Sequence, residues 1–369
     1  MGEEQLKELV GLLENYYNNI GDITNYYLEK KLERLQKYKY TDISKQVFSD
    51  FTISPLDMDI SVEVVDGKTF NNITTQVATF PIESQIGRTI TIGVKENNTN
   101  TWLGFIRLSS PVSSIKPRND IFGMSLPLEL INKHIYNGSV IVPVQPFGYN
   151  YLGGKLLALI CSSNEVKEIY NQKYNTNILM CETTSLYGST KGSSMYDGLE
   201  PYFKFKGLTQ SNNTLIPTDE LYFHIRDILR VYYGKEEWGG SLVNPKGSSP
   251  KSRELSKMIS ILKNDIKEVD EDRYKTFNQT IKEKSKTQQQ KRFYVSTFGN
   301  MNVVQHLLEN EELNTQNNYK HDLNNLVNLW KNKSYKRWNK LNENSMLKNE
   351  LEIYTTTNIT NGINFKIIR

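Results

Sequence analysis

The stretch VIVPVQPFGYNYLGGKLLAL, residues 140–159, predicts a β-strand that runs directly into a helix. The β-branched residues of 139–147 are typical of a strand, and the leucine-rich segment 151–163 is typical of a helix packed on a sheet. Three glycines lie near the junction: Gly148, Gly153 and Gly154. They allow the backbone to approach a ligand closely, and N–H groups at the helix N-terminus suit a pyrophosphate. The same glycines also suit tight packing of the helix on the sheet.

If the junction binds an activated donor, its contacts are expected from the strand, the turn and the start of the helix: Val142, Val144, Gly148, Asn150, Tyr151, Gly153, Gly154 and Lys155. The donor is unknown, and an acyl-CoA-like molecule is one candidate. The usual acetyl-CoA signature, Gln or Arg, two residues, Gly, one residue, then Gly or Ala, is absent. Counted from Asn150 the last position is Lys155, and counted from Tyr149 the first Gly position is Leu152.

The segments around this junction predict one α/β domain. Alternating apolar and polar residues over 58–108 are typical of an antiparallel meander. Short helices are expected at 127–136 and at 164–174, the second capped by Asn164. The segment NILMCETTSLYG (177–188) predicts a further strand, followed by a Gly/Ser-rich loop over 189–198.

The flanking regions are predicted to be helical. Residues 3–38 show one apolar face with a break at Gly21-Asp22, and Thr218-Asp219-Glu220 begins a helix that ends at Gly234. The resulting division has four parts: an N-terminal helical segment (1–50), an α/β domain (51–235), a linker (236–252) and a basic, helical C-terminal region (253–369).

Composition excludes several classes of protein. The chain has 369 residues and a net charge of +4, which permits nucleic-acid binding without requiring it. Two cysteines, Cys161 and Cys181, indicate a reducing cytoplasm and buried thiols, not a disulfide framework. No CxxC or HxxxH spacing occurs, so no local metal site is predicted. The N-terminus does not resemble a signal peptide, and no apolar run has the length of a membrane span.

Five residues are candidates for chemistry: Glu182, Tyr187, Tyr196, Arg118 and Asp197. Glu182 lies in an apolar strand, where burial would raise its pKa and favour a general base; a structural ion pair with Arg118 is the alternative. Arg118 would otherwise bind a phosphate. Either tyrosine could protonate a leaving group or stack on an extruded base, although packing is the simpler role. Asp197 lies in an Asp-Gly turn.

The segment VNLWKNKSYKRWNKL (327–341) predicts a basic helix with interleaved aromatic residues. Its candidate nucleic-acid contacts are Lys331, Lys333, Lys336, Arg337, Trp338 and Lys340. Such residues suit a phosphate backbone, and they are equally typical of a solvated helix face.

Several of these pieces, in this order, resemble one family: GFIRLSSPV (104–112), RNDIFG (118–123), VIVPV (140–144), YLGGKLLAL (151–159), ETTSLYG (182–188), the Tyr196 region and Gly207-x-Thr209. The stretch 104–210 resembles the domain of unknown function in the DruA subunit of Druantia anti-phage systems. That family is similar to acyltransferase-like (GNAT-like) and Mom-type DNA modification proteins. The segment LEPYFKFKGLT (199–209) departs from the aromatic-rich pattern usual there, so a shared substrate does not follow.

The resemblance implies a GNAT-like mixed sheet flanked by helices, within an α/β (α+β) chain that has helical N- and C-terminal regions. It also implies DNA as a partner, together with other proteins of a phage or defence system. No membrane partner is expected, because no apolar run has the length of a span. Three functions remain open. The first is a DNA-modifying transferase that adds a small group to a base, for which an adenine amine must leave the base stack. The second is a non-catalytic DNA-binding or assembly protein, and the third is a small-molecule N-acyltransferase.

Overall fold

The computed structural model describes residues 1–360 except 22, 83–84, 86, 186–193 and 243–249. The chain divides into two compact units. The helical unit consists of Met1–Arg34 and Ser211–Gln289, and the sheet unit of Leu35–Gln210 and Gln290–Arg369. The helical unit is therefore made from the N-terminal segment and an insertion in the sequence of the sheet unit. The four-part division made from the sequence stays a prediction.

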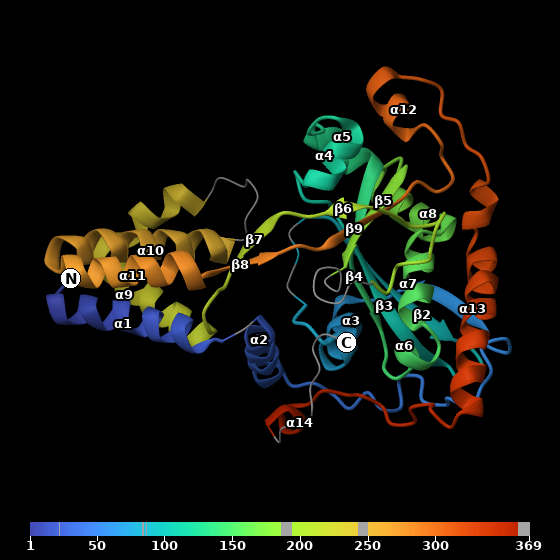
Figure 1. The fold of residues 1–369 in the computed structure, drawn as a ribbon, viewed down its shortest axis with the longest axis horizontal. Helices are drawn as coiled ribbons and strands as arrows, with labels where there is room; N and C mark the ends of the chain where they lie inside the picture. The colour runs from blue at the N-terminus through green and yellow to red at the C-terminus, as the bar shows by residue number, and fades with distance from the viewer. Residues whose placement is uncertain (22, 83–84, 86, 186–193, 243–249, 361–369) are drawn as a thin grey trace. The chain divides into compact units, whose positions relative to one another are not determined.

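A seven-stranded mixed sheet with the order β1-β2-β3-β4-β5-β9-β6 forms the centre of the sheet unit (Figure 1). Its strands are β1 (Ile60–Val64), β2 (Thr89–Glu96), β3 (Thr101–Ser109), β4 (Ile135–Pro143), β5 (Met180–Ser185), β6 (Lys204–Leu208) and β9 (Arg292–Ser296). All neighbouring pairs are antiparallel except β4 and β5, which are parallel. The mixed α/β fold expected from the sequence is confirmed.

The predicted meander over 58–108 corresponds to β1, β2 and β3. It contains a helix that the sequence analysis missed, α3 (Gly67–Val77), between β1 and β2. Asp66 caps α3, because its side chain accepts hydrogen bonds from the backbone N–H groups of Lys68 and Thr69.

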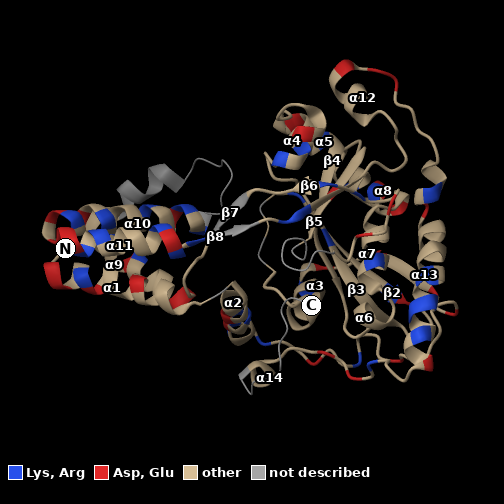
Figure 2. Cartoon of the chain, in the orientation of Figure 1, with Lys and Arg blue, Asp and Glu red and all other residues tan. Residues whose placement is uncertain are grey.

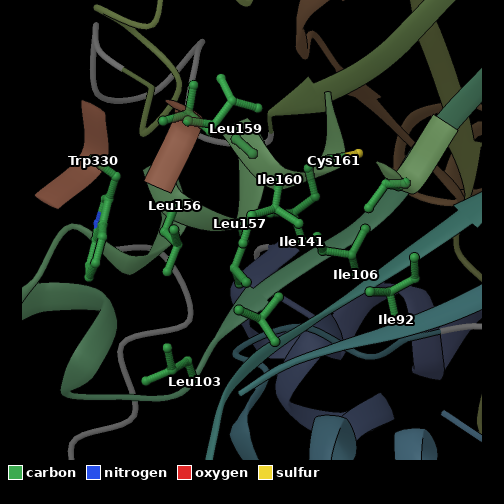
Figure 3. Packing of buried hydrophobic residues seen from close by; sticks show 14 of the residues in the cluster. Ile92, Leu103, Ile106, Ile141, Leu156, Leu157, Leu159, Ile160, Cys161 and Trp330 are labelled. Atoms are coloured by element: carbon green, nitrogen blue, oxygen red, sulfur yellow. The ribbon is translucent and has the colours of Figure 1, made fainter. Parts of the chain in front are cut away.

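Helices cover both faces of the sheet. Besides α3, this unit contains α4 (Lys116–Phe122), α5 (Leu128–His134), α6 (Phe147–Asn150), α7 (Gly153–Cys161), α8 (Asn164–Tyr174), α12 (Val303–Glu309) and α13 (Leu323–Glu343), with a short 3-10 helix (Asn318–His321) and α14 (Thr356–Thr360). Tyr136 of β4 packs in a core with α7, α8 and α13, whereas Ile135 packs with α4 and α5. Adjacent strand residues point to opposite faces, so these two groups of helices lie on opposite sides. Figure 3 shows the first core, with Ile106, Ile141, Leu157, Ile160 and Trp330 labelled.

Two expectations require correction. The side chain of Ser163, not that of Asn164, caps α8 by accepting a hydrogen bond from Val166 N. The segment RFYVS was included in the helical C-terminal region, but it forms β9, inserted between β5 and β6. Its aromatic and β-branched residues favour a strand, and four of the five are buried.

The buried thiols predicted from the sequence are confirmed. Cys161 ends α7 and Cys181 lies on β5; both are fully buried and unbridged, with the two Sγ atoms 3.8 Å apart. Burial raises the pKa of Cys181, so this thiol is held in its unreactive, protonated form.

The helical unit packs α1 (Glu3–Asn19), α9 (Asp219–Leu242), α10 (Pro250–Val269) and α11 (Glu271–Lys284) around one apolar core. In the sequence, β7 (Ser211–Thr214) precedes α9 and β8 (Lys286–Gln289) follows α11. These two strands pair antiparallel. The predicted break near Gly21 is present, since α1 ends at Asn19 and α2 (Ile23–Lys37) follows. Gly234, with φ +73°, divides α9 into two helical segments, so the first segment ends where the sequence predicted.

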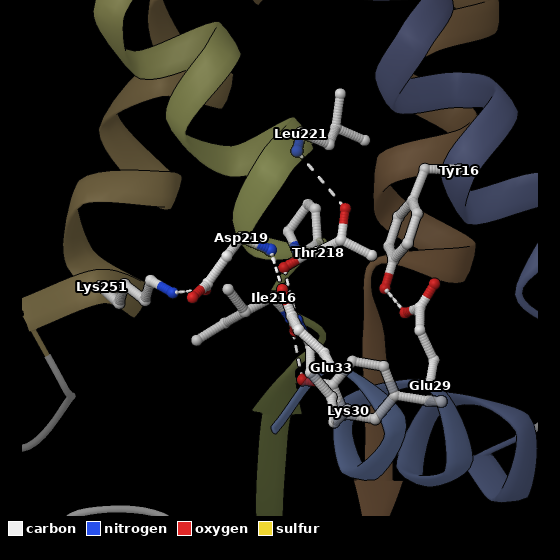
Figure 4. A network of polar contacts seen from close by, with 11 residues as sticks. Tyr16, Glu29, Lys30, Glu33, Ile216, Thr218, Asp219, Leu221 and Lys251 are labelled. Carbon is white, nitrogen blue, oxygen red and sulfur yellow. Dashed lines mark hydrogen bonds and ion pairs between the residues drawn. The ribbon is translucent and has the colours of Figure 1, made fainter. Parts of the chain in front are cut away.

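Polar contacts tie α2 to α1 and to the start of α9 (Figure 4). The Tyr16 hydroxyl donates to Glu29 at 2.7 Å, and Lys30 Nζ donates to the carbonyl of Pro217 at 2.6 Å. Glu33 accepts from the backbone N–H of Asp219, whose carboxylate pairs with Lys251. The N-terminal segment is thus bonded to an insertion almost 200 residues away in the sequence.

Candidate functional site

The strand-to-helix junction predicted from residues 140–159 is present, with the short helix α6 between β4 and α7. β4 and β5 pair in parallel only from Ile135–Met180 to Gly138–Thr183. Beyond Gly138, β4 continues to Pro143 and remains bonded to β3, whereas β5 is bonded to β9. The two parallel strands therefore stop pairing before β4 reaches the junction.

Side chains of the protein itself occupy the space beside the three junction glycines. A Cβ atom on Gly153 would lie 2.5 Å from the Phe147 ring, and one on Gly154 would lie 2.5 Å from Met195 Cε. A Cβ on Gly148 would overlap the side chain of Gln145. These contacts support the packing interpretation of the glycines.

The other residues expected to contact a donor have structural partners. Val142 and Val144 are buried in a core with α3 residues. Tyr151 is buried and stacks on Phe147, while its hydroxyl donates to the carbonyl of Ile53 at 2.9 Å. Asn150 is fully buried and bonds the backbone of Lys348. Lys155, in the first turn of α7, also reaches a second group of candidate residues.

This second group surrounds the turn at 194–198. Lys155 Nζ donates to the carbonyl of Asp197, and Lys333 Nζ from α13 donates to that of Gly198 at 3.0 Å. Burial and the nearby Lys333 charge lower the pKa of Lys155. The structure thus brings together three residues that the sequence placed in separate groups: a donor contact, a catalytic candidate and a nucleic-acid contact.

The Asp197 carboxylate is fixed from β9. The Tyr294 hydroxyl donates to Oδ1 at 2.6 Å, Arg292 Nη2 lies 3.3 Å from Oδ1, and Ser194 N donates to Oδ2 at 2.8 Å. Burial opposes ionisation, but these donors and Lys155 together hold the pKa of Asp197 below its usual range. A carboxylate with a lowered pKa is a weak base at neutral pH, so its geometry suits an anchor for the turn.

Tyr196 is buried beside this anchor. Its ring packs edge-on against Tyr294, with ring centroids 5.5 Å apart, and stacks near Phe203. Tyr187 lies outside the described residues. Sequence reasoning missed Arg292 and Tyr294, although the alternation of RFYVS would have placed both on one face of a strand.

Glu182 and Arg118 form a buried ion pair. Arg118 Nη1 lies 3.1 Å from both carboxylate oxygens, and Nη2 donates to the carbonyls of Val112 and Ser113 at 2.6 and 3.0 Å. Both side chains are at most 3% exposed. Burial raises the pKa of Glu182 to about 7, although Arg118 opposes the shift. This pairing is the structural alternative considered from the sequence.

The ion pair and the Asp197 anchor lie on opposite faces of the sheet. Glu182 is paired across the ladder with Val295, which packs with α4 and α5. Thr183, the next residue, is paired with Tyr294, which packs in the other core with Tyr196. Since adjacent strand residues point to opposite faces, Glu182 and Tyr196 do not meet in one site.

The predicted basic helix is α13. Its tryptophans and most of its lysines lie on different faces of the helix. Trp330 and Trp338 are buried, and their indole N–H groups donate to the carbonyls of Tyr151 and Phe51. Lys333, Lys336 and Lys340 are exposed, and Figure 2 shows basic residues along this helix. Lys331 Nζ donates to Leu56 O at 3.2 Å, and Arg337 Nε donates to Tyr149 O at 2.7 Å. The two tryptophans therefore fix the helix, and Lys333, Lys336 and Lys340 face solvent.

Comparisons with known proteins give one match. The model of the family described as Druantia protein DruA matches residues 14–241, which is more than half of the chain and includes parts of both units. No curated protein and no solved structure matches. Within the described residues, no helix combines the length and apolar character that crossing a membrane requires.

Proposed function

The chain belongs to the Druantia protein DruA family, and from this premise we propose that it is a DNA-binding subunit of an anti-phage defence system. The family supplies the role in defence and, with it, the expectation of other proteins of the system as partners. The part that DNA would play rests on the charges of the sheet unit. This unit carries 27 Lys and Arg against 22 Asp and Glu, so the net positive charge of the chain belongs to it.

The observation that carries the proposal is the solvent face of α13. Five Lys or Arg residues and one acidic residue, Glu343, lie on this helix of 21 residues. Lys333, Arg337 and Lys340 follow the i, i+4, i+7 spacing of one helical face, beside Lys336. Because the two buried tryptophans hold the helix on the sheet, the cations stand on a rigid support. A fixed row of cations suits the phosphate backbone, which gives affinity without sequence choice.

The test is the affinity of the full chain for a fluorescent DNA duplex, measured by anisotropy. The triple variant Lys333→Glu/Lys336→Glu/Lys340→Glu should weaken binding by at least tenfold. The matched control reverses three exposed lysines of the helical unit, Lys267→Glu/Lys275→Glu/Lys282→Glu, with the same change in net charge. Equal losses in both variants would mean that only net charge matters, and would contradict an interface on α13.

A DNA-modifying transferase is the second candidate. The observation that favours it is the end of β4–β5 pairing at Gly138–Thr183, before the turn that leads to α7. In the acyltransferase-like layout, a strand that separates from its parallel neighbour and feeds a helix holds the donor. Lys155, with its lowered pKa, stands in the first turn of that helix.

Mass spectrometry of nucleosides separates the two candidates. DNA from cells that express the chain would be compared with DNA from cells that express Lys155→Met. An adduct that is present with the wild type and absent with the variant would support the transferase. Unmodified DNA from cells that contain folded protein would leave the DNA-binding role as the function.

A further inference from the structure

Arg337 of α13 is held in a fixed orientation by Tyr149. Its Nε donates to the carbonyl of Tyr149 at 2.7 Å, and its Cζ lies 4.6 Å from the centre of the Tyr149 ring. One residue therefore fixes the guanidinium twice, through a hydrogen bond at Nε and through the face of the ring. Such a guanidinium loses little further freedom when it binds a ligand.

The outer edge of this guanidinium is available. In the part of the chain that the structure describes, no acceptor contacts Nη1 or Nη2 of Arg337, and the side chain is half-buried, with access to solvent. Arg118, by contrast, uses both terminal nitrogens on protein acceptors. Two parallel N–H donors with a free edge match the geometry of a phosphate.

A second cation reaches the same ring from another segment. Lys348 Nζ lies 4.7 Å from the centre of the Tyr149 ring. The backbone of Lys348 is fixed, because Asn150 Nδ2 donates to its carbonyl at 2.8 Å and its N–H donates to Asn150 Oδ1 at 3.1 Å. The carboxylate of Glu352 lies 3.6 Å from Lys348 Nζ. Asn150 is fully buried, so its two hydrogen bonds to the Lys348 backbone are made inside the fold.

Two cations on one aromatic ring repel each other, and an anion that contacts both removes that cost. Lys336 and Lys340, both exposed on α13, add to the positive potential around the ring. We propose that Arg337 and Lys348, positioned by Tyr149 and Asn150, form a binding site for one phosphate group. This inference rests on the proposed function where the phosphate belongs to a nucleic-acid strand, and a free phosphate is the other source of the same chemistry.

The first experiment measures binding of the full chain to the DNA duplex. Arg337→Lys keeps the positive charge but removes the two parallel N–H donors of the guanidinium. The affinity for DNA should therefore fall about tenfold, while its salt dependence stays unchanged. Tyr149→Leu should give a similar loss of affinity, because it removes the aromatic ring that holds Arg337. Tyr149→Phe keeps the ring and should bind DNA like the wild type, because the hydroxyl does not position Arg337. DNA binding by the wild type with no loss in Arg337→Lys or Tyr149→Leu would overturn the site and leave the proposed function standing.

The second experiment decides the case in which the wild type does not bind DNA, which would remove the proposed function. Inorganic phosphate is titrated into the protein while the Nε–H resonance of Arg337 is followed by NMR and assigned by its loss in Arg337→Lys. A saturable shift in the wild type and in Tyr149→Phe, absent in Tyr149→Leu, supports a site for free phosphate. An Nε–H resonance that does not respond to phosphate overturns the inference.

Discussion

Arg118 Nη1 lies equidistant from the two carboxylate oxygens of Glu182, at 3.1 Å from each, in the interior of the sheet unit. The same guanidinium also binds the carbonyls of Val112 and Ser113. This one side chain therefore attaches the segment before α4 to β5. The arrangement assigns Glu182 a structural role, on the face of the sheet away from Tyr196 and Asp197.

Replacement of Arg118 by methionine should destabilise the fold strongly. The variant leaves the Glu182 carboxylate buried without its counterion, and such a loss costs about 3–5 kcal/mol. Urea unfolding followed by circular dichroism at pH 8 measures the effect. The double variant Arg118→Met/Glu182→Met removes both charges and should recover most of the stability. A single variant as stable as the wild type would refute this role.

Glu182 should stabilise the folded state more at low pH than at high pH, which is the reverse of a carboxylate whose pKa is lowered by folding. Burial raises the pKa of Glu182 in the folded chain to about 7, above the 4.5 of an exposed glutamate. Above pH 7 the carboxylate is ionised in both states, and the folded state bears the cost of burying the charge. As the pH falls from 7 to about 4.5 the folded state takes up the proton first, so this group adds stability.

Glu182→Gln isolates that contribution, because glutamine does not titrate. The difference in unfolding free energy between the wild type and Glu182→Gln, measured at pH 8 and at pH 5.5, should shift in favour of the wild type at the lower pH. A difference that is the same at both pH values would show that the pKa of Glu182 is not raised.

The two kinds of aromatic residue on α13 should respond differently to truncation. Trp330 is 1% exposed and packs in the core with α7, so Trp330→Ala should cost about 3–5 kcal/mol. Tyr335 is 37% exposed on the same helix, and Tyr335→Ala should change stability by less than about 1 kcal/mol. Chemical denaturation of both variants makes the comparison, and a tolerated Trp330→Ala would contradict the packing of α13 as described.

Asn150 should control the order of the segment that follows α13. Its amide makes two hydrogen bonds to the backbone of Lys348, and Asn150→Ala removes both, at a cost of about 1–3 kcal/mol. Hydrogen exchange read by mass spectrometry should become faster over 345–352 in the variant, while β2 and β3 keep their protection. Unchanged exchange over 345–352 would show that other contacts hold the segment.

The sequence predicted the elements whose signal is local. Three such signals depend only on residues close in the sequence: the alternation over 58–108, the leucines of α7 and the break near Gly21. The strands, the helix and the break that they predicted are all present. β9 was missed because its pairing with β5 and β6 is made across long separations. α3 was missed because its apolar residues are few, and the N-cap of α8, Ser163, lies one residue before the cap chosen from the sequence.

The candidate site was predicted less completely. A lone carboxylate in the run ILMCETT correctly indicated a costly buried charge, and the pairing with Arg118 was one of the two interpretations. The spacing could not reveal that Lys155, Asp197 and Lys333 converge, since they come from three separate elements. Nor could it distinguish Trp338, which is 9% exposed, from the lysines beside it, because helical phase decides burial only after the partner surface is known.

The salt dependence of DNA binding reports how many phosphates the lysines of α13 neutralise. The logarithm of the affinity falls with the logarithm of salt concentration in proportion to the number of phosphates neutralised, about 0.9 per contact. If Lys333, Lys336 and Lys340 each bind a phosphate, the slope for Lys333→Glu/Lys336→Glu/Lys340→Glu should be smaller than that of the wild type by about 3. The control Lys267→Glu/Lys275→Glu/Lys282→Glu should keep the wild-type slope. Equal slopes for all three proteins would contradict a DNA interface on α13.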